Sequence, residues 1–147
     1  MTLDEITAYV HAHIPVTLSL GARVEAYDGA SVRLGAPLTP NLNHTGTAFG
    51  GSLSAIAILS GWVLVHLKLR EAGIANQLVI QRSTLDFDAP VEGDFTATAT
   101  LPDPKPWDRF LATLARHRIA RVIVSSRLAG PSGAGGRHEG TFVATRT

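Results

Sequence analysis

Apolar residues recur at helical spacing near the start of the chain and at strand spacing soon after it. Apolar side chains three to four residues apart between Leu3 and Ile14 predict an amphipathic helix. The run 2–5, Thr-Leu-Asp-Glu, predicts a capping box at its first turn, and Pro15 is expected to end it. Apolar runs on both sides of Asp28-Gly29 predict a β-hairpin over 24–34.

The most apolar part of the chain lies in the middle. Gly50-Gly51-Ser52 is expected to open a long helix that runs to about Ala72 and stops at Gly73. Because this segment is apolar nearly all round, we expect it to be enclosed on most sides. Its apolar stretch is shorter than the roughly 20 residues of a membrane span and is interrupted by polar residues. We therefore expect a soluble core helix and no membrane partner.

The second half reads mainly as strands. Strands are predicted over 78–87, 95–101, 119–128 and 141–145, with an amphipathic helix over 106–118 and a glycine-rich turn region over 130–140. The connection 36–49 is long, and ordered loops of this length are usually functional. One apolar helix set against strands that follow one another predicts an α+β fold with an antiparallel sheet, in a single domain over 1–147.

The amino-acid composition excludes several kinds of functional site. The chain has 45% hydrophobic and 17% charged residues, which suits a folded domain with a sizeable core. It has no cysteine, so disulfides, thiolate zinc sites and a cysteine nucleophile are excluded. The six histidines show no metal-ligand spacing, and we expect no metal and no cofactor. An acidic start without an apolar stretch behind it favours a cytoplasmic protein over a secreted one.

Charge is unevenly distributed although the net charge is only +1. Residues 1–103 carry a net −5 and residues 104–147 a net +6. A basic last third can attract phosphate groups, but it can also be an ordinary solvated surface. Few aromatic residues lie among these arginines, which argues against a nucleic-acid partner.

The segment 40–52 carries the candidate chemistry, since it leads from a polar loop into the first turn of the buried helix. The first N–H groups of a helix lack internal partners, and glycines let a ligand approach them closely. Gly50 and Gly51 are therefore candidates for holding a carbonyl oxygen as it becomes an oxyanion, and Asn43 for binding water or that carbonyl. The alternative is that the glycines only allow close packing and that Asn43 caps a turn.

This segment resembles the hotdog-fold thioesterase superfamily, and within it the thioesterase family of the YiiD C-terminal type. The resemblance extends from about residue 38 to 144. The residues that carry it are Asn41-x-Asn43-x-x-Gly46-Thr47-Ala48-Phe49-Gly50-Gly51-Ser52-Leu53, Gly61-Trp62, Val79-Ile80, Ser83, Phe87-x-x-Pro90-Val91, Trp107 and Phe110-Leu111. It implies a long helix wrapped by a curved antiparallel sheet, a homodimer or dimer of dimers formed by joining sheets, and metal-free hydrolysis of acyl-CoA or acyl-carrier-protein thioesters.

The chain departs from the related PaaI-like pattern at the catalytic positions. Asn43 and the two glycines match that pattern, but Phe49 stands where it has a histidine. Ile58 stands where it has a catalytic aspartate on the helix. The sequence therefore leaves open which residue acts as the general base.

Three kinds of side chain can be considered for that base or for water binding. Asp86 and Asp88, two residues apart on a predicted strand, are the carboxylate candidates; the alternatives are a solvated face for Asp86 and the turn before Pro90 for Asp88. His44 titrates near neutral pH and lies beside Asn43. Ser52 could bind the carbonyl or orient water, but no Gly-x-Ser-x-Gly elbow is present for a covalent serine.

The expected substrate contacts are spread over three segments. They are His44, Thr47 and Phe49 in the loop, Ser83 and Thr84 beside the pantetheine arm, and Arg116 and Arg118 at the CoA phosphates. A non-catalytic acyl-CoA or acyl-carrier binding module on the same scaffold is the alternative function. A dehydratase, which would need a catalytic histidine ahead of the helix, ranks last.

Overall fold

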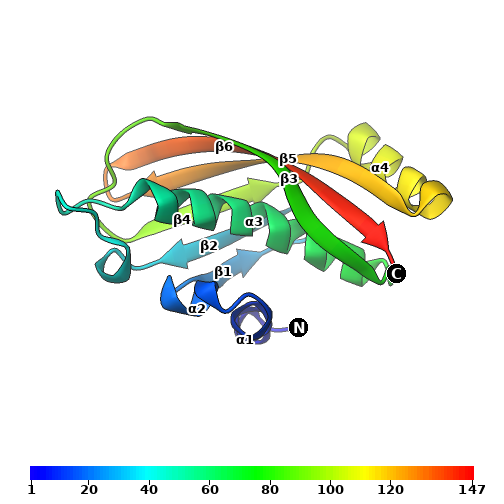
Figure 1. The fold of residues 1–147 in the computed structure, drawn as a ribbon, viewed down its shortest axis with the longest axis horizontal. Coiled ribbons are helices and arrows are strands. Elements are labelled where there is room, and N and C mark those ends of the chain that lie inside the picture. Colours follow the sequence, from blue (N-terminus) through cyan, green and yellow to red (C-terminus); the bar gives the residue numbers. More distant parts are fainter.

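The computed structural model describes residues 1–147, and Figure 1 shows one sheet curved around a long helix. The helices are α1 (Leu3–His13), α2 (Val16–Ser19), α3 (Gly50–Glu71) and α4 (Pro104–His117), with a 3-10 turn, η1 (Thr39–Asn41). The strands are β1 (Arg23–Tyr27), β2 (Ser31–Ala36), β3 (Asn76–Phe87), β4 (Phe95–Thr100), β5 (Ile119–Gly130) and β6 (Gly133–Arg146). They lie in the order β1-β2-β4-β5-β6-β3, and all neighbours are antiparallel.

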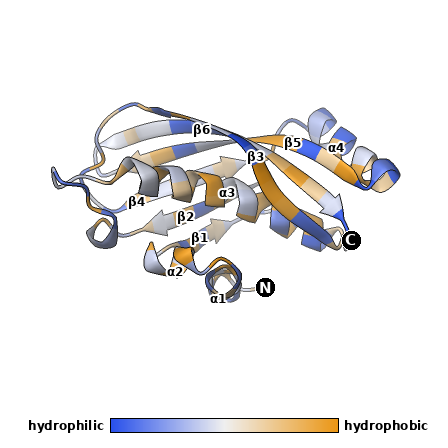
Figure 2. Cartoon of the chain, in the orientation of Figure 1, coloured by the Kyte–Doolittle hydropathy of each residue, from blue (hydrophilic) through white to orange (hydrophobic).

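The core lies between α3 and the concave face of the sheet. A single cluster of 29 buried apolar residues joins α3 to five of the six strands and to α1 and α4, and the partly buried Leu78, Ile80 and Leu85 of β3 pack against it. Figure 2 shows hydrophobic stretches on β3 and β5, whereas the loop before α3, at the left, is mostly hydrophilic. The predicted α+β arrangement of one long helix against an antiparallel sheet is confirmed.

The helix α3 is the one element whose length and hydropathy would also suit a membrane span. However, 67% of its apolar window is buried inside the domain. Burial of this kind is typical of the core helix that the sequence predicts.

Local signals placed most elements correctly. At α1, the Glu5 N–H donates to Thr2 Oγ1 at 3.1 Å and the Thr2 N–H donates to the Glu5 carboxylate at 3.3 Å, so the capping box is confirmed. The hairpin around Asp28-Gly29 is also confirmed. The short helix α2 was not predicted, and α4 begins at Pro104 rather than Pro106.

The glycine-rich segment 130–140 is a correction, because it is mostly strand and not a turn region. Only residues 131–132 lie outside β5 and β6. A Cβ at Gly136 would lie 2.8 Å from the Asp86 carbonyl oxygen, and one at Gly135 would lie 2.8 Å from the Val91 side chain. These glycines therefore let other parts of the chain pack closely against a regular strand.

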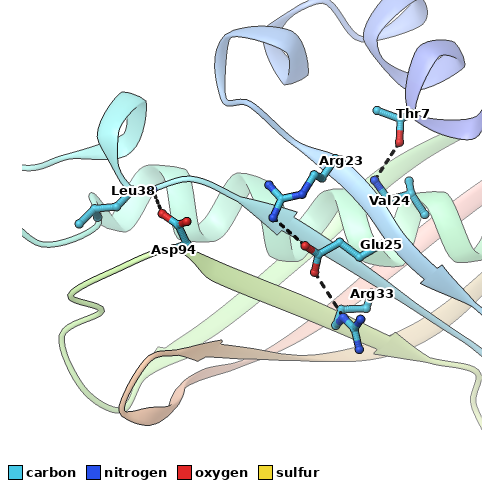
Figure 3. A network of polar contacts seen from close by, with 7 residues as sticks. All are labelled: Thr7, Arg23, Val24, Glu25, Arg33, Leu38 and Asp94. Carbon is cyan, nitrogen blue, oxygen red and sulfur yellow. Dashed lines mark hydrogen bonds and ion pairs between the residues drawn. The ribbon is translucent and has the colours of Figure 1, made fainter. Parts of the chain in front are cut away.

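The two edges of the sheet are protected differently. β1 has five residues, and α1 is fastened beside it because the Val24 N–H donates to Thr7 Oγ1 at 2.9 Å (Figure 3). β3 has twelve residues, pairs only with β6, and carries the exposed side chains of Val79 and Phe87. A long uncovered edge strand is a surface prepared for pairing with another strand.

Candidate active site

The loop between β2 and α3 is tied to the rest of the domain at both ends. At its start, the Leu38 N–H donates to Asp94 Oδ1 at 2.9 Å (Figure 3). At its end, the Ala48 N–H donates to the Val91 carbonyl at 2.8 Å, and the Phe49 N–H donates to the Asn41 carbonyl at 2.7 Å. The loop therefore enters α3 along a fixed path.

Asn43 organises the turn in the middle of this loop. Its Oδ1 accepts from the Thr45 N–H at 2.9 Å, from the Thr45 hydroxyl at 2.9 Å and from the Thr47 N–H at 3.0 Å. Its Nδ2 donates to the Thr47 hydroxyl at 2.7 Å. Since an amide side chain has few further hydrogen bonds to offer, most of its capacity is used inside the turn. This geometry matches the turn-capping alternative for Asn43.

The first turn of α3 has no cap. Phe49 is the N-cap residue and offers no side-chain acceptor, and Ser52 is the first residue of the turn whose N–H is bonded, to the Phe49 carbonyl at 2.9 Å. The N–H groups of Gly50 and Gly51 have no acceptor in the chain. The dipole of a 22-residue helix adds positive potential at this point.

Side-chain contacts explain why two glycines stand here. A Cβ at Gly51 would run into the Phe49 ring, which folds back over the helix start. A Cβ at Gly50 would lie 3.4 Å from the Phe87 ring, which is at the limit of ordinary contact. A side chain at Gly51 would therefore require the Phe49 ring to move, whereas Gly50 leaves space between α3 and β3.

That space is part of a cavity of about 420 Å³ at the start of α3. Its walls are half apolar, and they bring together three of the predicted site residues with the end of β3. The residues that line the cavity are Asn43, Thr47, Ala48, Gly50, Leu53, Phe87, Asp88, Ala89, Pro90 and Val91. A partly apolar cavity with free N–H donors can hold a carbonyl oxygen beside an apolar chain.

Asp88 is the one carboxylate on the walls of this cavity. Its two oxygens lie 3.2 Å and 3.4 Å from Nη2 and Nε of Arg137, and the Asp88 N–H donates to the Gly135 carbonyl at 3.0 Å. The ion pair raises the pKa of the Arg137 guanidinium. The carboxylate is thus held in a fixed orientation and is 35% exposed.

Asp86 and Thr84 are not brought together with Asn43 and Gly50. Both lie on the outer face of β3, where they line a different cavity of about 600 Å³. The alternation of side chains along a strand explains this placement, because Phe87 points to the helix side and its neighbour points away from it. Ser83 lies on the helix side, where its hydroxyl meets His138.

The remaining predicted residues are scattered within one subunit. His44 and Phe49 are exposed, and Ser52 is buried with no hydrogen bond to its hydroxyl. Arg116 lies in the last turn of α4, and Arg118 follows it with a positive φ of 65°. Figure 1 shows α4 at the end of the molecule opposite the start of α3.

Sequence reasoning missed one polar pair. Ser83 and His138 are 55 residues apart, and only the register of β3 on β6 places their side chains side by side. No local pattern signals such a pair. Among the His, Asp and Glu side chains, no group of three or more is placed to hold a metal ion.

Comparison with known proteins assigns the family. The model of the family described as "Putative thioesterase (yiiD_Cterm)" matches residues 3–146, so the chain belongs to this thioesterase family. A solved protein of unknown function from Chlorobaculum tepidum is 27% identical, with a TM-score of 0.92 over 98% of this chain and 94% of that one.

Two further solved structures share the fold. The "putative thioesterase" from Shewanella oneidensis is 24% identical, with a TM-score of 0.87 over 97% of this chain and 96% of its own. A "probable thioesterase" from Pseudomonas aeruginosa is 21% identical, with a TM-score of 0.85 over 100% of this chain and 97% of its own. The α3-centred sheet is therefore the hotdog fold.

Proposed function

We propose that the protein hydrolyses acyl thioesters of CoA or of an acyl carrier protein. The observation that carries the proposal is the pair of unbonded N–H groups at Gly50 and Gly51, of which Gly50 lines a half-apolar cavity. Membership in a thioesterase family adds the reaction class. A cytoplasmic location is part of this proposal.

In this mechanism the Gly50 and Gly51 N–H groups hold the thioester carbonyl oxygen. A water molecule attacks the carbonyl carbon, and the Asp88 carboxylate accepts its proton as general base. The developing oxyanion is stabilised by the two donors and the helix dipole. The C–S bond then breaks, and the thiolate takes up the proton. Asn43 acts as a positioning residue, because it holds the loop that forms one wall of the cavity.

The uncovered β3 edge supports a homodimer in which two β3 strands pair about a twofold axis. Antiparallel pairing brings the Asn76 end of one β3 beside the Phe87 end of the other. Arg146 lies opposite Asn76, and its N–H donates to the Arg118 carbonyl at 2.7 Å. The basic end of one subunit would thus approach the cavity of its partner, which is the arrangement that CoA phosphates at Arg116 and Arg118 require.

Sedimentation at micromolar concentration tests this assembly. We expect a dimer or a dimer of dimers, and a stable monomer would contradict it. In the dimer, replacing Arg116 and Arg118 together by glutamate should raise KM for CoA esters, and added salt should have a similar effect through screening. An unchanged KM would leave these arginines as ordinary surface charges.

A non-catalytic acyl-CoA or acyl-carrier binding module is the second candidate. It is favoured by the pairing of Asp88 with Arg137, which occupies the one carboxylate of the cavity. Such a module would bind the thioester without releasing thiol.

A thiol-release assay separates the two candidates. The chain has no cysteine, so a thiol reagent would report released CoA or carrier thiol without a background from the protein. We expect turnover on part of a panel of acyl-CoA and acyl-carrier substrates, with loss of turnover in Asp88→Asn and retention in Asp86→Asn. Saturable binding without thiol release would instead establish the binding module.

A further inference from the structure

A second cavity lies further along the edge strand β3 from the Gly50 cavity. Phe87, on the helix side of β3, forms a wall of the Gly50 cavity, and Ile80 on the same side forms a wall of the second cavity, which has a volume of about 260 Å³. The second cavity is almost entirely apolar. Its walls are Ile14, Val16, Thr17, Leu20, Ala55, Ile58, Leu59, Trp62 and Ile80. An acyl chain that starts at Gly50 and runs along β3 would reach this apolar cavity.

Ser83 lies between the two cavities on β3. A shift of register between Ile80 and Arg82 keeps Ile80 and Ser83 on the helix side although they are three residues apart. The Ser83 hydroxyl lies 2.8 Å from Nε2 of His138. His138 is 3% exposed, whereas Ser83 is exposed on the uncovered strand. The path therefore has a polar group in the middle and apolar walls at its far end.

The surroundings of His138 define what this pair can do. Nδ1 of His138 is buried without a hydrogen-bond partner. Burial lowers the pKa of His138, and Glu139 opposes that shift only in part, so the ring is neutral at neutral pH. A buried lone pair without a partner is tolerated better than a buried N–H without one. The favoured tautomer carries its proton on Nε2 and donates it to the Ser83 oxygen.

This tautomer makes Ser83 a hydrogen-bond donor and not a nucleophile. With Nε2 already protonated, His138 cannot accept the hydroxyl proton. No carboxylate lies at Nδ1 to stabilise an imidazolium. The hydroxyl hydrogen of Ser83 is instead free to point into the space between α3 and β3.

We propose that Ser83 binds an oxygen atom carried by the acyl chain of the substrate, far from the thioester. This inference rests on the proposed thioesterase function, because it takes the carbonyl to lie at Gly50. Ser83 and Phe87 are four positions apart, which is roughly 13 Å along a strand. That length corresponds to roughly ten carbon–carbon bonds of an extended chain. The substrate class is therefore an acyl thioester with a hydroxyl or carbonyl oxygen roughly ten bonds from its thioester carbonyl.

Selectivity follows from desolvation. A plain alkyl chain would cover the Ser83 hydroxyl without accepting its hydrogen, and sites built to hydrogen-bond a substrate group reject analogues that lack it. We expect the oxygenated chain to bind at least about tenfold more tightly than the plain chain.

Two non-hydrolysable thioethers test the inference without relying on turnover. They are S-decyl-CoA and S-(10-hydroxydecyl)-CoA, with Kd measured by calorimetry on the wild-type protein, on Ser83→Ala and on the matched control Ser83→Thr. We expect the hydroxylated ligand to bind about tenfold more tightly to the wild type and to Ser83→Thr, and equally with the plain ligand to Ser83→Ala.

Several outcomes would overturn the proposal. They are equal affinity in the wild type, a ratio unchanged in Ser83→Ala, and binding of neither ligand. An equal loss of affinity for both ligands in Ser83→Ala would place the pantetheine arm at Ser83 instead. Thiol release from the panel of acyl-CoA and acyl-carrier substrates, measured separately, decides the proposed function alone.

Discussion

The two ends of α3 are built in opposite ways. At the C-terminal end, the Gly73 N–H donates to the Arg70 carbonyl and the Ile74 N–H to the Leu69 carbonyl, both at 3.0 Å, and Gly73 has a φ of +71°. This is a Schellman motif, which satisfies the last carbonyl groups of the helix. At the N-terminal end, the first N–H groups are unbonded and no side chain caps them.

Among the other helices only α1 has a side-chain cap, since α2 and α4 have none. α1 begins with a complete capping box, although it lies on the surface. Unbonded donors at the start of a buried helix cost stability unless water or a ligand satisfies them. The unbonded donors of Gly50 and Gly51 are therefore available to water or to a ligand.

The largest expected effect concerns Gly50. In Gly50→Val the branched side chain would project toward Phe87 and fill the cavity, so we expect kcat/KM to fall at least about 100-fold, as when an oxyanion donor is lost. In the matched control Gly50→Ala the Cβ fits at 3.4 Å from the ring, and we expect less than about a tenfold loss. Equal turnover in both variants and the wild type would remove Gly50 from the site.

Asn43 should have the next largest effect. Asn43→Ala removes the acceptor of three hydrogen bonds and the donor to Thr47, so the loop should lose its order. We expect kcat to fall by about tenfold or more and stability to fall by about 1–3 kcal/mol, measured by urea unfolding.

Asn43→Asp is the matched control, because it keeps the acceptor oxygen and replaces the Nδ2 donor by a second, charged oxygen. We expect it to retain most of the stability of the loop. Full turnover in Asn43→Ala would limit this residue to turn formation.

The opposite end of the helix should respond in stability alone. Gly73→Ala places a side chain at a positive φ with no nearby atoms, so only backbone strain changes. We expect the free energy of unfolding to fall by about 1–2 kcal/mol while kcat and KM stay unchanged. A loss of turnover at this position would show that the two ends of α3 are not functionally distinct.

The smallest expected effect is a dependence of stability on pH. Burial lowers the pKa of His66 and of His138 below the ordinary value of 6.5; Arg70 and His13 add to the shift at His66, and Glu139 opposes it at His138. The unfolded chain therefore binds more protons just below pH 6.5, so stability is complete above this value and falls as the pH decreases.

Paired glutamine variants measure that dependence. Replacing His66 and His138 together should flatten the decline in unfolding free energy between about pH 7 and about pH 5. Replacing the exposed His44 should leave it unchanged. A decline of equal slope in all three proteins would assign it to other groups.

The sequence predicted what local signals encode. The capping box at Thr2, the hairpin at Asp28-Gly29 and the limits of α3 follow from neighbouring residues, and the structure has them. The prediction of a turn over 133–140 was wrong. The glycines of this strand allow close contacts with Asp86 and Val91, which are far away in the sequence.

In the candidate site, too, residues that are close in the sequence could be predicted and residues brought in from distant segments could not. Asn43, Thr47 and Gly50 share a cavity because they are close in the chain. Asp88 joins them from the end of β3, and His138 meets Ser83 through the register of two strands. Neither neighbour could be placed without knowing the order of strands in the sheet.

The central claim is that the Gly50 and Gly51 N–H groups hold the substrate carbonyl. Amide NMR of the ¹⁵N-labelled protein tests it with two CoA analogues of equal chain length. One is a ketone with CH₂ in place of sulfur, which keeps the carbonyl, and the other is a thioether, which lacks it. We predict downfield shifts of the Gly50 and Gly51 amide protons with the ketone and not with the thioether. Equal shifts with both analogues, or no shift at these two residues when the ketone binds, would contradict the account.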